Sequence, residues 1–354
     1  MKLPCGILFV GTGVSSSVPL LHHALNSENY KCLCSYVGKK EGPYDMTKNT
    51  RNNVSILVRI PNMQEKENGD DDCYNILIDL GKSFREAAIT IFPNYNISKI
   101  DSVILTHFHN DAVAGFSSIL HFQQKKETLV PIYLNAETLD LVNKRHNKII
   151  KNYAFEDNLV NSKDLKRRYE LNVFDIYNGK IEKCLNSNKL YNILDSFNKE
   201  SKFNNNKKFK KIEFSINNIK ITAFPMNHGN CICMGYCFHF EKQNVIYISD
   251  YTFPMLDSSI EFLNSIKDEK RSTLILDSIS YNKTSNAHAN ISQSLKFIQE
   301  FSPDYVYFIG MSCSVEHDET NKILNNELIN LKNDGKCINT ISIELAYDGL
   351  FLPI

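Results

Sequence analysis

Short apolar runs rich in Val, Ile, Phe and Tyr recur along most of the chain. Each run has the length of a β-strand, and most of the runs end at Gly, Asp, Asn or His. Such runs, closed by turn-forming residues, are typical of buried strands. The pattern therefore predicts strands at Ile7–Val10, Val54–Ile60, Ile76–Leu80, Ser102–Leu105, Pro131–Leu134, Ile212–Ile216, Ile219–Phe224, Met234–Phe240, Val245–Ile248, Thr273–Leu276, Tyr305–Ile309 and Ile341–Leu345.

Segments between some of these strands have the spacing of helices. From Ile291 to Ile298 the apolar residues fall at i, i+4 and i+7, which places them on one helical face. We predict helices at Asp111–Phe122, Ala136–Tyr153, Ile291–Phe301 and Glu319–Asn333. Because strands dominate both halves and helices lie between them, the expected α/β fold is two packed sheets covered by helices on the outside.

Length and composition favour one large folded unit. The 354 residues, 42% of them hydrophobic, are sufficient for a substantial core, so we expect a single domain over residues 1–354. The stretch from about Asn158 to Lys211 differs, because it is rich in Lys and Asn and has little sustained apolar pattern. We interpret it as a solvated insertion, with a basic substrate-binding arm as the alternative.

The charge balance and the cysteine content limit the kinds of partner and the cellular compartment that we expect. Lys and Arg together number 40, as do Asp and Glu, so nothing draws the whole chain to nucleic acid or to an anionic membrane. The first residues lack the apolar core of a signal peptide, and no apolar run has the ~20 residues that span a bilayer. The ten scattered cysteines read as reduced thiols. We expect a cytoplasmic protein, with a nuclear location and a homodimer left open.

The segment Thr106–Asp111 carries the strongest chemical signal. It follows a predicted strand directly and reads Thr-His-Phe-His-Asn-Asp, so His107, His109 and Asp111 occupy alternating positions. Two imidazoles and a carboxylate that converge beyond a strand end suit Zn²⁺, Mn²⁺ or Fe. In the alternative interpretation, Asp111 only caps the next helix and the histidines are polar loop residues.

Two further strand ends supply candidate ligands. His228 follows the strand Ile219–Phe224, and Asp250 follows the strand Val245–Ile248. Each residue alone would more often be an ordinary loop residue. Their places at strand ends raise the expectation that they join His107 and His109 at one edge of the sheets.

This set of residues resembles the metallo-β-lactamase superfamily in order and spacing. The opening Gly11–Pro19 (Gly-Thr-Gly-Val-Ser-Ser-Ser-Val-Pro) resembles the branch that contains phosphoribosyl 1,2-cyclic phosphate phosphodiesterase. Arg51–Ser55 (Arg-Asn-Asn-Val-Ser) and Ala346–Leu350 resemble further segments of that branch. The resemblance implies a metallo-β-lactamase αββα sandwich over nearly the whole chain.

The resemblance also implies a division of the ligands between two metals. His107, His109 and His228 would hold one metal, Asp250 would bridge, and Asp111 would hold the second. The histidine that bacterial members carry after this aspartate is Ala112 here, as in a eukaryotic sub-branch. The last histidine ligand of the family corresponds to Cys313, so we expect one complete metal site and one weakened site.

Two further sites are implied by the same branch. His288 corresponds to a histidine that lies near the substrate phosphate and acts as a general acid, although a helix-start loop residue is the alternative. Cys32, Cys34 and His317 correspond to ligands of a structural metal, which requires a fourth ligand that His22 or His23 could supply.

The resulting hypothesis is a metal-dependent hydrolase that attacks a small cyclic or linear phosphodiester with an activated water. In this mechanism Asp111 orients the water and His288 protonates the leaving oxygen. Two alternatives stay open: a tRNA 3′-processing endonuclease of the same superfamily, and a non-catalytic metal-binding protein on a degenerate enzyme fold.

Overall fold

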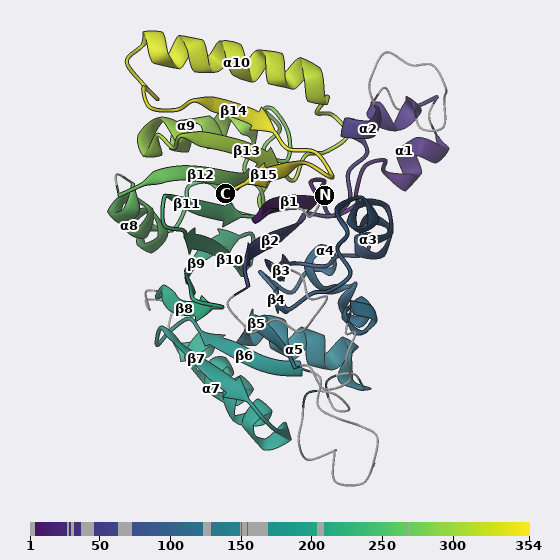
Figure 1. Ribbon diagram of the computed structural model, residues 1–354, viewed down its shortest axis with the longest axis vertical. Helices are drawn as coiled ribbons and strands as arrows, with labels where there is room; N and C mark the ends of the chain where they lie inside the picture. Colours follow the sequence, from purple (N-terminus) through teal and green to yellow (C-terminus); the bar gives the residue numbers. More distant parts are fainter. Residues whose placement is uncertain are drawn as a thin grey trace.

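The computed structural model describes residues 4–26, 28–29, 32–36, 46–62, 73–122, 129–148, 150, 154, 169–203, 209–267 and 269–354. Its strands form two sheets (Figure 1). The first sheet has the order β15-β1-β2-β3-β4-β5-β6-β7, with β1 (Gly6–Gly11), β2 (Ser55–Pro61), β3 (Cys73–Ile78), β4 (Ser102–Ile104), β5 (Val130–Asn135), β6 (Tyr169–Asp175), β7 (Lys180–Cys184) and β15 (Phe351–Pro353).

The second sheet is built from the later part of the chain. Its order is β14-β13-β12-β11-β10-β9-β8, with β8 (Ile212–Ile216), β9 (Ile219–His228), β10 (Cys231–His239), β11 (Gln243–Ile248), β12 (Arg271–Asp277), β13 (Tyr305–Ile309) and β14 (Ser342–Leu345). Because β15 returns to pair with β1, the two chain ends lie near each other in Figure 1.

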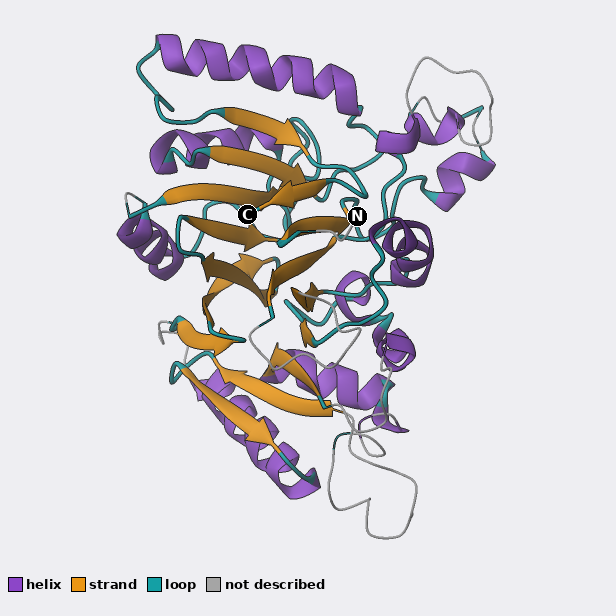
Figure 2. Ribbon diagram, in the orientation of Figure 1, coloured by secondary structure: helices purple, strands orange, loops and turns teal. Residues whose placement is uncertain are grey.

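Helices lie outside the sheets, as Figure 2 shows. The first sheet is accompanied by α3 (Phe84–Ile91), α4 (Asn110–Val113), α5 (Ala136–Arg145), α7 (Ser187–Phe203) and the 3-10 helices η2 (Phe92–Tyr95) and η3 (Phe116–Phe122). The second is accompanied by α8 (Asp257–Ile266), α9 (Ile291–Phe301) and α10 (His317–Asn333). The short helices α1 (Leu21–Leu25), η1 (Leu33–Tyr36) and α2 (Met46–Asn49) lie between β1 and β2 in sequence.

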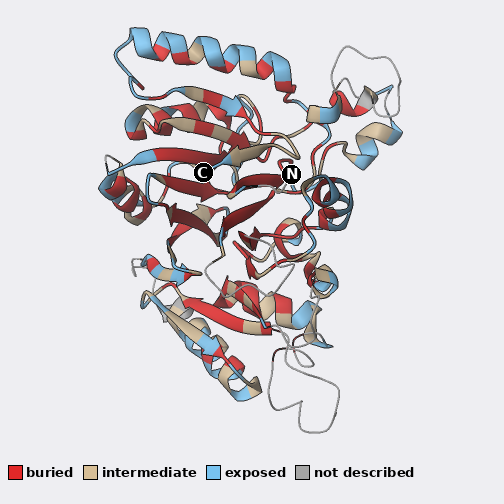
Figure 3. Cartoon of the chain, in the orientation of Figure 1, coloured by how far each residue is buried: buried red, intermediate tan, exposed pale blue. Residues whose placement is uncertain are grey.

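The alternating direction of side chains along each strand explains why the two sheets and their outer helices form four layers. In β2, Ile56, Val58 and Ile60 pack between the sheets, whereas Leu57 faces the helices of the first sheet. A separate core joins the second sheet to α8, α9 and α10, and the buried strands stand out against the exposed outer helix faces in Figure 3. This arrangement confirms the predicted αββα sandwich.

The predicted helix Asp111–Phe122 is divided in the structure. The α4 segment ends at Val113 and the chain continues as η3 from Phe116. Between them, Gly115 lies so close to the first sheet that a Cβ atom would approach the Gly81 carbonyl oxygen to 2.7 Å. The helix predicted at Ala136–Tyr153 begins as expected, but α5 ends at Arg145, and residues 149 and 151–153 lie outside the described residues.

The prediction of a solvated loop over Asn158–Lys211 is wrong for residues 169–203. This part forms β6, β7 and α7, and Tyr169, Leu171 and Val173 are buried in the core. Most of its Lys and Asn residues are exposed and lie between buried residues, so they dilute the apolar pattern, which explains why the sequence predicts a loop. Residues 158–168 and 204–208 lie outside the described residues.

The topology gathers chemically reactive residues at one edge of the sandwich. His107 follows β4 in the first sheet, whereas His228 ends β9, Asp250 follows β11 and Asp277 ends β12 in the second sheet. The strand pairs β3–β4 and β11–β12 are parallel, so their carboxyl ends lie together.

Among the described helices, none is both long and apolar enough to cross a membrane.

Candidate metal centre

Three histidine rings meet at this edge of the sheets. The ring centroids of His107 lie 4.7 Å from His109 and 5.0 Å from His228, and those of His109 and His228 are 5.0 Å apart. Their ring nitrogens form one group whose atoms all lie within 4.8 Å of one another. The carboxylate of Asp250 belongs to overlapping groups with His107 and with His228. The structure thus brings together four of the residues that the sequence singled out.

Hydrogen bonds behind the rings fix which nitrogen faces the centre. His107 Nδ1 lies 2.9 Å from the Thr106 hydroxyl, which donates to Asp79 Oδ2 at 2.7 Å and can therefore accept from the imidazole. His228 Nδ1 donates to the Ala287 carbonyl at 2.8 Å. In both rings Nε2 is consequently the bare nitrogen that is free to bind a cation.

The surroundings keep these side chains in the protonation states that metal binding requires. Burial lowers the pKa of His107 to about 4, and burial together with His228 also lowers the pKa of His109, so both rings are neutral at physiological pH. Burial alone would raise the pKa of Asp250, but the adjacent histidines outweigh it and hold this pKa low. Neutral imidazoles and an ionised carboxylate are good ligands for a divalent cation.

Two observations test whether a cation fits this set. His107 Nε2 is buried and has no hydrogen-bond partner among the described residues. His109 Nδ1 and His228 Nε2 lie 3.1 Å apart, and because His228 donates its proton to Ala287, its Nε2 is an acceptor that His109 or a cation can satisfy. A cation at this place would also give the buried His107 Nε2 the partner that it lacks among the described residues. The residues therefore fit a metal ion.

Asp111 lies at the rim of the centre rather than within these ligand groups. Its Oδ2 accepts a hydrogen bond of 2.7 Å from the Ser15 hydroxyl. Asn53 holds the Ser15 loop by donating from Nδ2 to the carbonyl oxygens of Val14 and Ser15 at 3.1 and 3.0 Å. This loop can approach so closely because Gly13 has no Cβ, which would lie 2.7 Å from Arg51 Cβ. The sequence motif after β1 thus positions Asp111.

His288 reaches the centre with a carboxylate partner that the sequence analysis did not identify. Its Nδ1 lies 2.9 Å from Asp277 Oδ2 and 3.5 Å from Asp250 Oδ1. Burial lowers the pKa of His288, but Asp277 more than compensates and raises it to about 10. The signal for Asp277 was available, because it ends an apolar strand just as Asp250 follows one.

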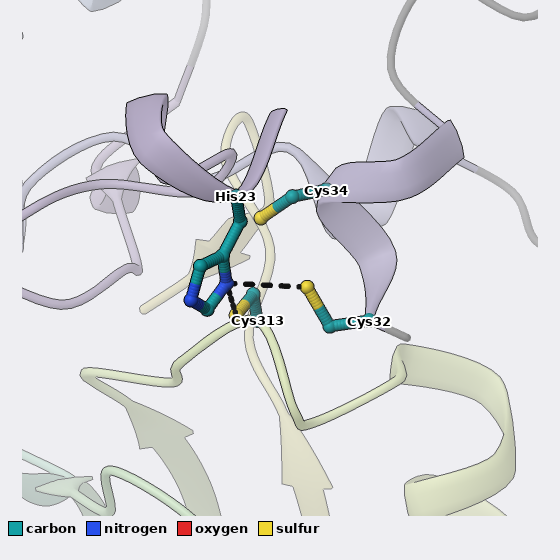
Figure 4. A group of neighbouring side chains, drawn as sticks. All are labelled: His23, Cys32, Cys34 and Cys313. Atoms are coloured by element: carbon teal, nitrogen blue, oxygen red, sulfur yellow. Dashed lines mark hydrogen bonds between the residues drawn. The ribbon is translucent and has the colours of Figure 1, made fainter. Parts of the chain in front are cut away.

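Cys313 lies elsewhere, which corrects the expectation that it completes a second catalytic metal site. Figure 4 shows its thiol with Cys32, Cys34 and His23, and the four ligand atoms all lie within 4.8 Å of one another. His23 Nδ1 lies 3.3 Å from Cys32 Sγ and 3.4 Å from Cys313 Sγ. The backbone amide of Leu20 donates to Cys34 Sγ at 3.1 Å.

This second group differs from the structural metal set expected from the sequence. Cys32 and Cys34 belong to it, but His317 does not. His317 is the first residue of α10, and its ring packs against Tyr347. Its Nε2 lies 3.1 Å from Asn321 Nδ2. Of the two histidines considered as replacements, His23 is in the group and His22 lies beside it.

The position after Asp111 supplies no ligand. Ala112 is buried with 2% of its surface exposed, and its side chain is part of the core beneath the first sheet. With Cys313 also outside the centre, neither residue contributes to a second metal position beside His107, His109, His228 and Asp250.

Comparisons with known proteins agree with this architecture. A model of the β-lactamase superfamily domain matches residues 74–174, whereas no curated protein matches the chain. A diphosphatase of the PhnP family is 20% identical with a TM-score of 0.63, and the match covers 99% of this chain and 98% of the other. The metallo-β-lactamase fold protein YhfI from Bacillus subtilis is 14% identical, with a TM-score of 0.53 and 99% of both chains covered.

A human enzyme is also similar in fold. The short form of human tRNase Z is 12% identical with a TM-score of 0.51, and the match covers 98% of each chain. Identities this low speak for the fold alone. Together with the matched domain segment, they show that the chain has the metallo-β-lactamase fold.

Proposed function

We propose that this protein is a metal-dependent hydrolase that cleaves a small phosphodiester. One observation carries the proposal: the ring nitrogens of three histidines form one group, and the buried carboxylate of Asp250 belongs to overlapping groups with two of them. Hydrogen bonds behind the rings of His107 and His228 leave Nε2 of each as the bare nitrogen. A purely structural role would not require such a constellation at the open edge of the sheets. The fold shared with a PhnP-family diphosphatase favours phosphorus as the atom attacked.

His107, His109, His228 and Asp250 would hold a single divalent ion, with Zn²⁺ the best match and Mn²⁺ or Fe as alternatives. When bound, such an ion supplies an acidified water and neutralises charge on the phosphodiester oxygens. We propose one ion at this centre because Ala112 and Cys313 provide no ligands for a second one.

The remaining residues divide the proton transfers between them. Asp111, fixed by Ser15, would orient the attacking water. His288 would donate a proton to the leaving oxygen through Nε2, since Asp277 holds its Nδ1. The protonated ring is stabilised by two neighbouring carboxylates, Asp277 and Asp250.

We further propose that His23, Cys32, Cys34 and Cys313 hold a structural zinc ion. Three thiols and one imidazole are a complete set of ligands for a four-coordinate zinc ion. Burial raises the pKa of both Cys34 and Cys313, and a cation among the sulfurs would offset this cost because ligand thiols bind as thiolates.

The activity is tested with one purified sample analysed for its metals and assayed on a substrate panel. We expect turnover of bis(p-nitrophenyl) phosphate and of a cyclic nucleotide, and no cleavage of precursor tRNA. Asp250→Asn serves as the inactive control, because it removes a ligand charge with little change in shape. Cleavage of the precursor tRNA alone would contradict the small-substrate proposal, and a folded, metal-loaded protein that turns over none of these would contradict enzymatic function.

The role of His288 predicts a dependence on the leaving group. In His288→Gln, hydrolysis of a cyclic nucleotide should fall by about 10²-fold or more, because a sugar alkoxide requires a proton to leave. Hydrolysis of bis(p-nitrophenyl) phosphate should fall less than about 10-fold, because p-nitrophenolate departs without a proton donor. Asp277→Asn should give the same pattern with smaller losses. Equal losses on both substrates would show that His288 acts by position alone.

A further inference from the structure

A cavity of about 580 Å³ adjoins the chain segment that carries the proposed ligand His228. Asn227 and Gly229, the two chain neighbours of the ligand His228, belong to its lining. The volume lies in the range of sites for small organic ligands and exceeds what a phosphate group alone would fill. The cavity therefore has room for a substantial part of a substrate beyond the reacting phosphate.

The wall contributed by the segment around α7 is aromatic. Tyr177, Phe197 and Phe209 line the cavity, and the Tyr177 ring centroid lies 6.0 Å from Phe197 and 5.6 Å from Phe209. All three side chains are only partly buried, so part of the cluster is open to a ligand. Aromatic faces of this kind stack on flat rings, including nucleobases.

A second wall of the cavity is acidic, because Glu137 and Asp140 at the start of α5 line it. The Glu137 carboxylate is bonded by the backbone amide of Ile232, and a carboxylate has further acceptor positions. Asp140 is paired with Lys144 at 2.5 Å. Among the described residues that line the cavity, none is Lys or Arg.

These walls match a ring that is flat and donates hydrogen bonds. Exocyclic amino groups of adenine, cytosine and guanine are donors that carboxylates accept well. A second phosphate would instead meet two carboxylates without a lining cation among the described residues. The cavity thus favours a neutral ring and disfavours a nucleic-acid strand that continues through it.

We propose that this cavity is a specificity subsite for an amine-bearing nucleobase, so that the substrate is a small nucleoside phosphodiester. The proposal rests on the proposed hydrolase function of the neighbouring metal centre. Tyr177, Phe197 and Phe209 would stack on the base, and Glu137 would accept from its amino group.

Three substrates with one leaving group test the subsite on the metal-loaded protein. They are adenosine 5′-(p-nitrophenyl phosphate), its uridine counterpart and methyl p-nitrophenyl phosphate, all of which release p-nitrophenolate. We expect kcat/KM for the adenosine compound to exceed that for the methyl ester by about 10- to 100-fold. The adenosine compound should also be preferred over the uridine compound, whose base offers a carbonyl in place of the amino group.

Two substitutions test whether the preference for the adenosine compound arises in the cavity. Phe197→Leu keeps apolar volume but loses the flat face, and should lower the adenosine-to-methyl ratio of kcat/KM by about 5-fold or more. Glu137→Gln keeps shape but replaces an acceptor with a donor, and should lower the adenosine-to-uridine ratio. Tyr191→Leu is the matched control, because Tyr191 lies on the same helix, is 70% exposed and does not line the cavity. Its ratios should equal those of the unaltered protein.

The outcomes separate the two proposals. Hydrolysis of none of the three compounds by a folded, metal-loaded sample would overturn the proposed function itself. Equal kcat/KM for the nucleoside and methyl compounds would overturn the subsite and leave the hydrolase function standing. A nucleoside preference that neither Phe197→Leu nor Glu137→Gln reduces would also overturn the subsite. Should Phe197→Leu fail to fold, as seen by circular dichroism, the Glu137→Gln comparison decides alone.

Discussion

Replacing His107 by alanine is expected to lower phosphodiesterase turnover by at least about 10³-fold, which corresponds to roughly 4 kcal/mol. The side chain is 1% exposed, and its Nε2 has no partner among the described residues other than the proposed ion. Its removal leaves His109, His228 and Asp250 as an incomplete set. Elemental analysis should therefore show one metal ion per chain in this variant and two in the unaltered protein, since the proposed zinc ligands of the cysteine group are untouched.

The control for this variant is His121→Ala, which removes an exposed histidine at the end of η3. It should retain both metal ions and full turnover. A His107→Ala protein that keeps two metal ions and substantial turnover would refute the assignment of the centre. Thermal unfolding of both variants distinguishes a lost metal ligand from a lost fold.

Replacing Cys34 by serine is expected to remove the structural ion and to lower the free energy of unfolding by about 3 kcal/mol or more. The four proposed ligands come from α1, from η1 and the residue before it, and from the segment after β13, so the ion would join the start of the chain to its last third. The loop between β1 and α1 also carries Ser15, which holds Asp111. Turnover should consequently fall together with stability.

Cys337→Ser provides the matched control for this prediction. Cys337 is also a buried thiol, but its Sγ lies 3.6 Å from the Ile298 carbonyl, an acceptor that a serine hydroxyl can reach. This variant should keep both metal ions and lose less stability than Cys34→Ser. Two metal ions per chain in Cys34→Ser, with an unchanged melting temperature, would show that the cysteine group holds no metal.

Most of the sandwich could be predicted because its strands are buried apolar runs with clear ends. Residues such as His107 and Asp250 were identifiable for the same reason, since a polar residue directly after a buried strand must lie at a sheet edge. The partners behind the metal centre were harder to predict. Asp277 ends a strand as well, but only the fold shows that it contacts His288 from eleven residues away in sequence.

The errors arise where sequence neighbours are not spatial neighbours. Cys313 was assigned by its order along the chain, whereas 290 residues separate it from His23, whose ring it contacts. Likewise, the sequence predicts a loop at α7 because Lys and Asn separate its buried residues, and at β6 because Glu170, Asn172 and Asp175 interrupt the apolar run. Burial of Tyr169 and Leu171 depends on neighbouring strand β5, which the local pattern does not contain.

The placement of the four proposed ligands has a consequence for how the molecule would open. His107 and His109 follow β4 of the first sheet, whereas His228 ends β9 and Asp250 follows β11 of the second. A bound ion would thus link the two sheets, beside the hydrogen bond from the Met234 amide to the Thr106 carbonyl that also joins them. Because such an ion would bind the folded arrangement and not the unfolded chain, it would oppose separation of the sheets at the edge where we propose that substrate binds. Substrate binding and the cohesion of the two sheets would then depend on the same few residues.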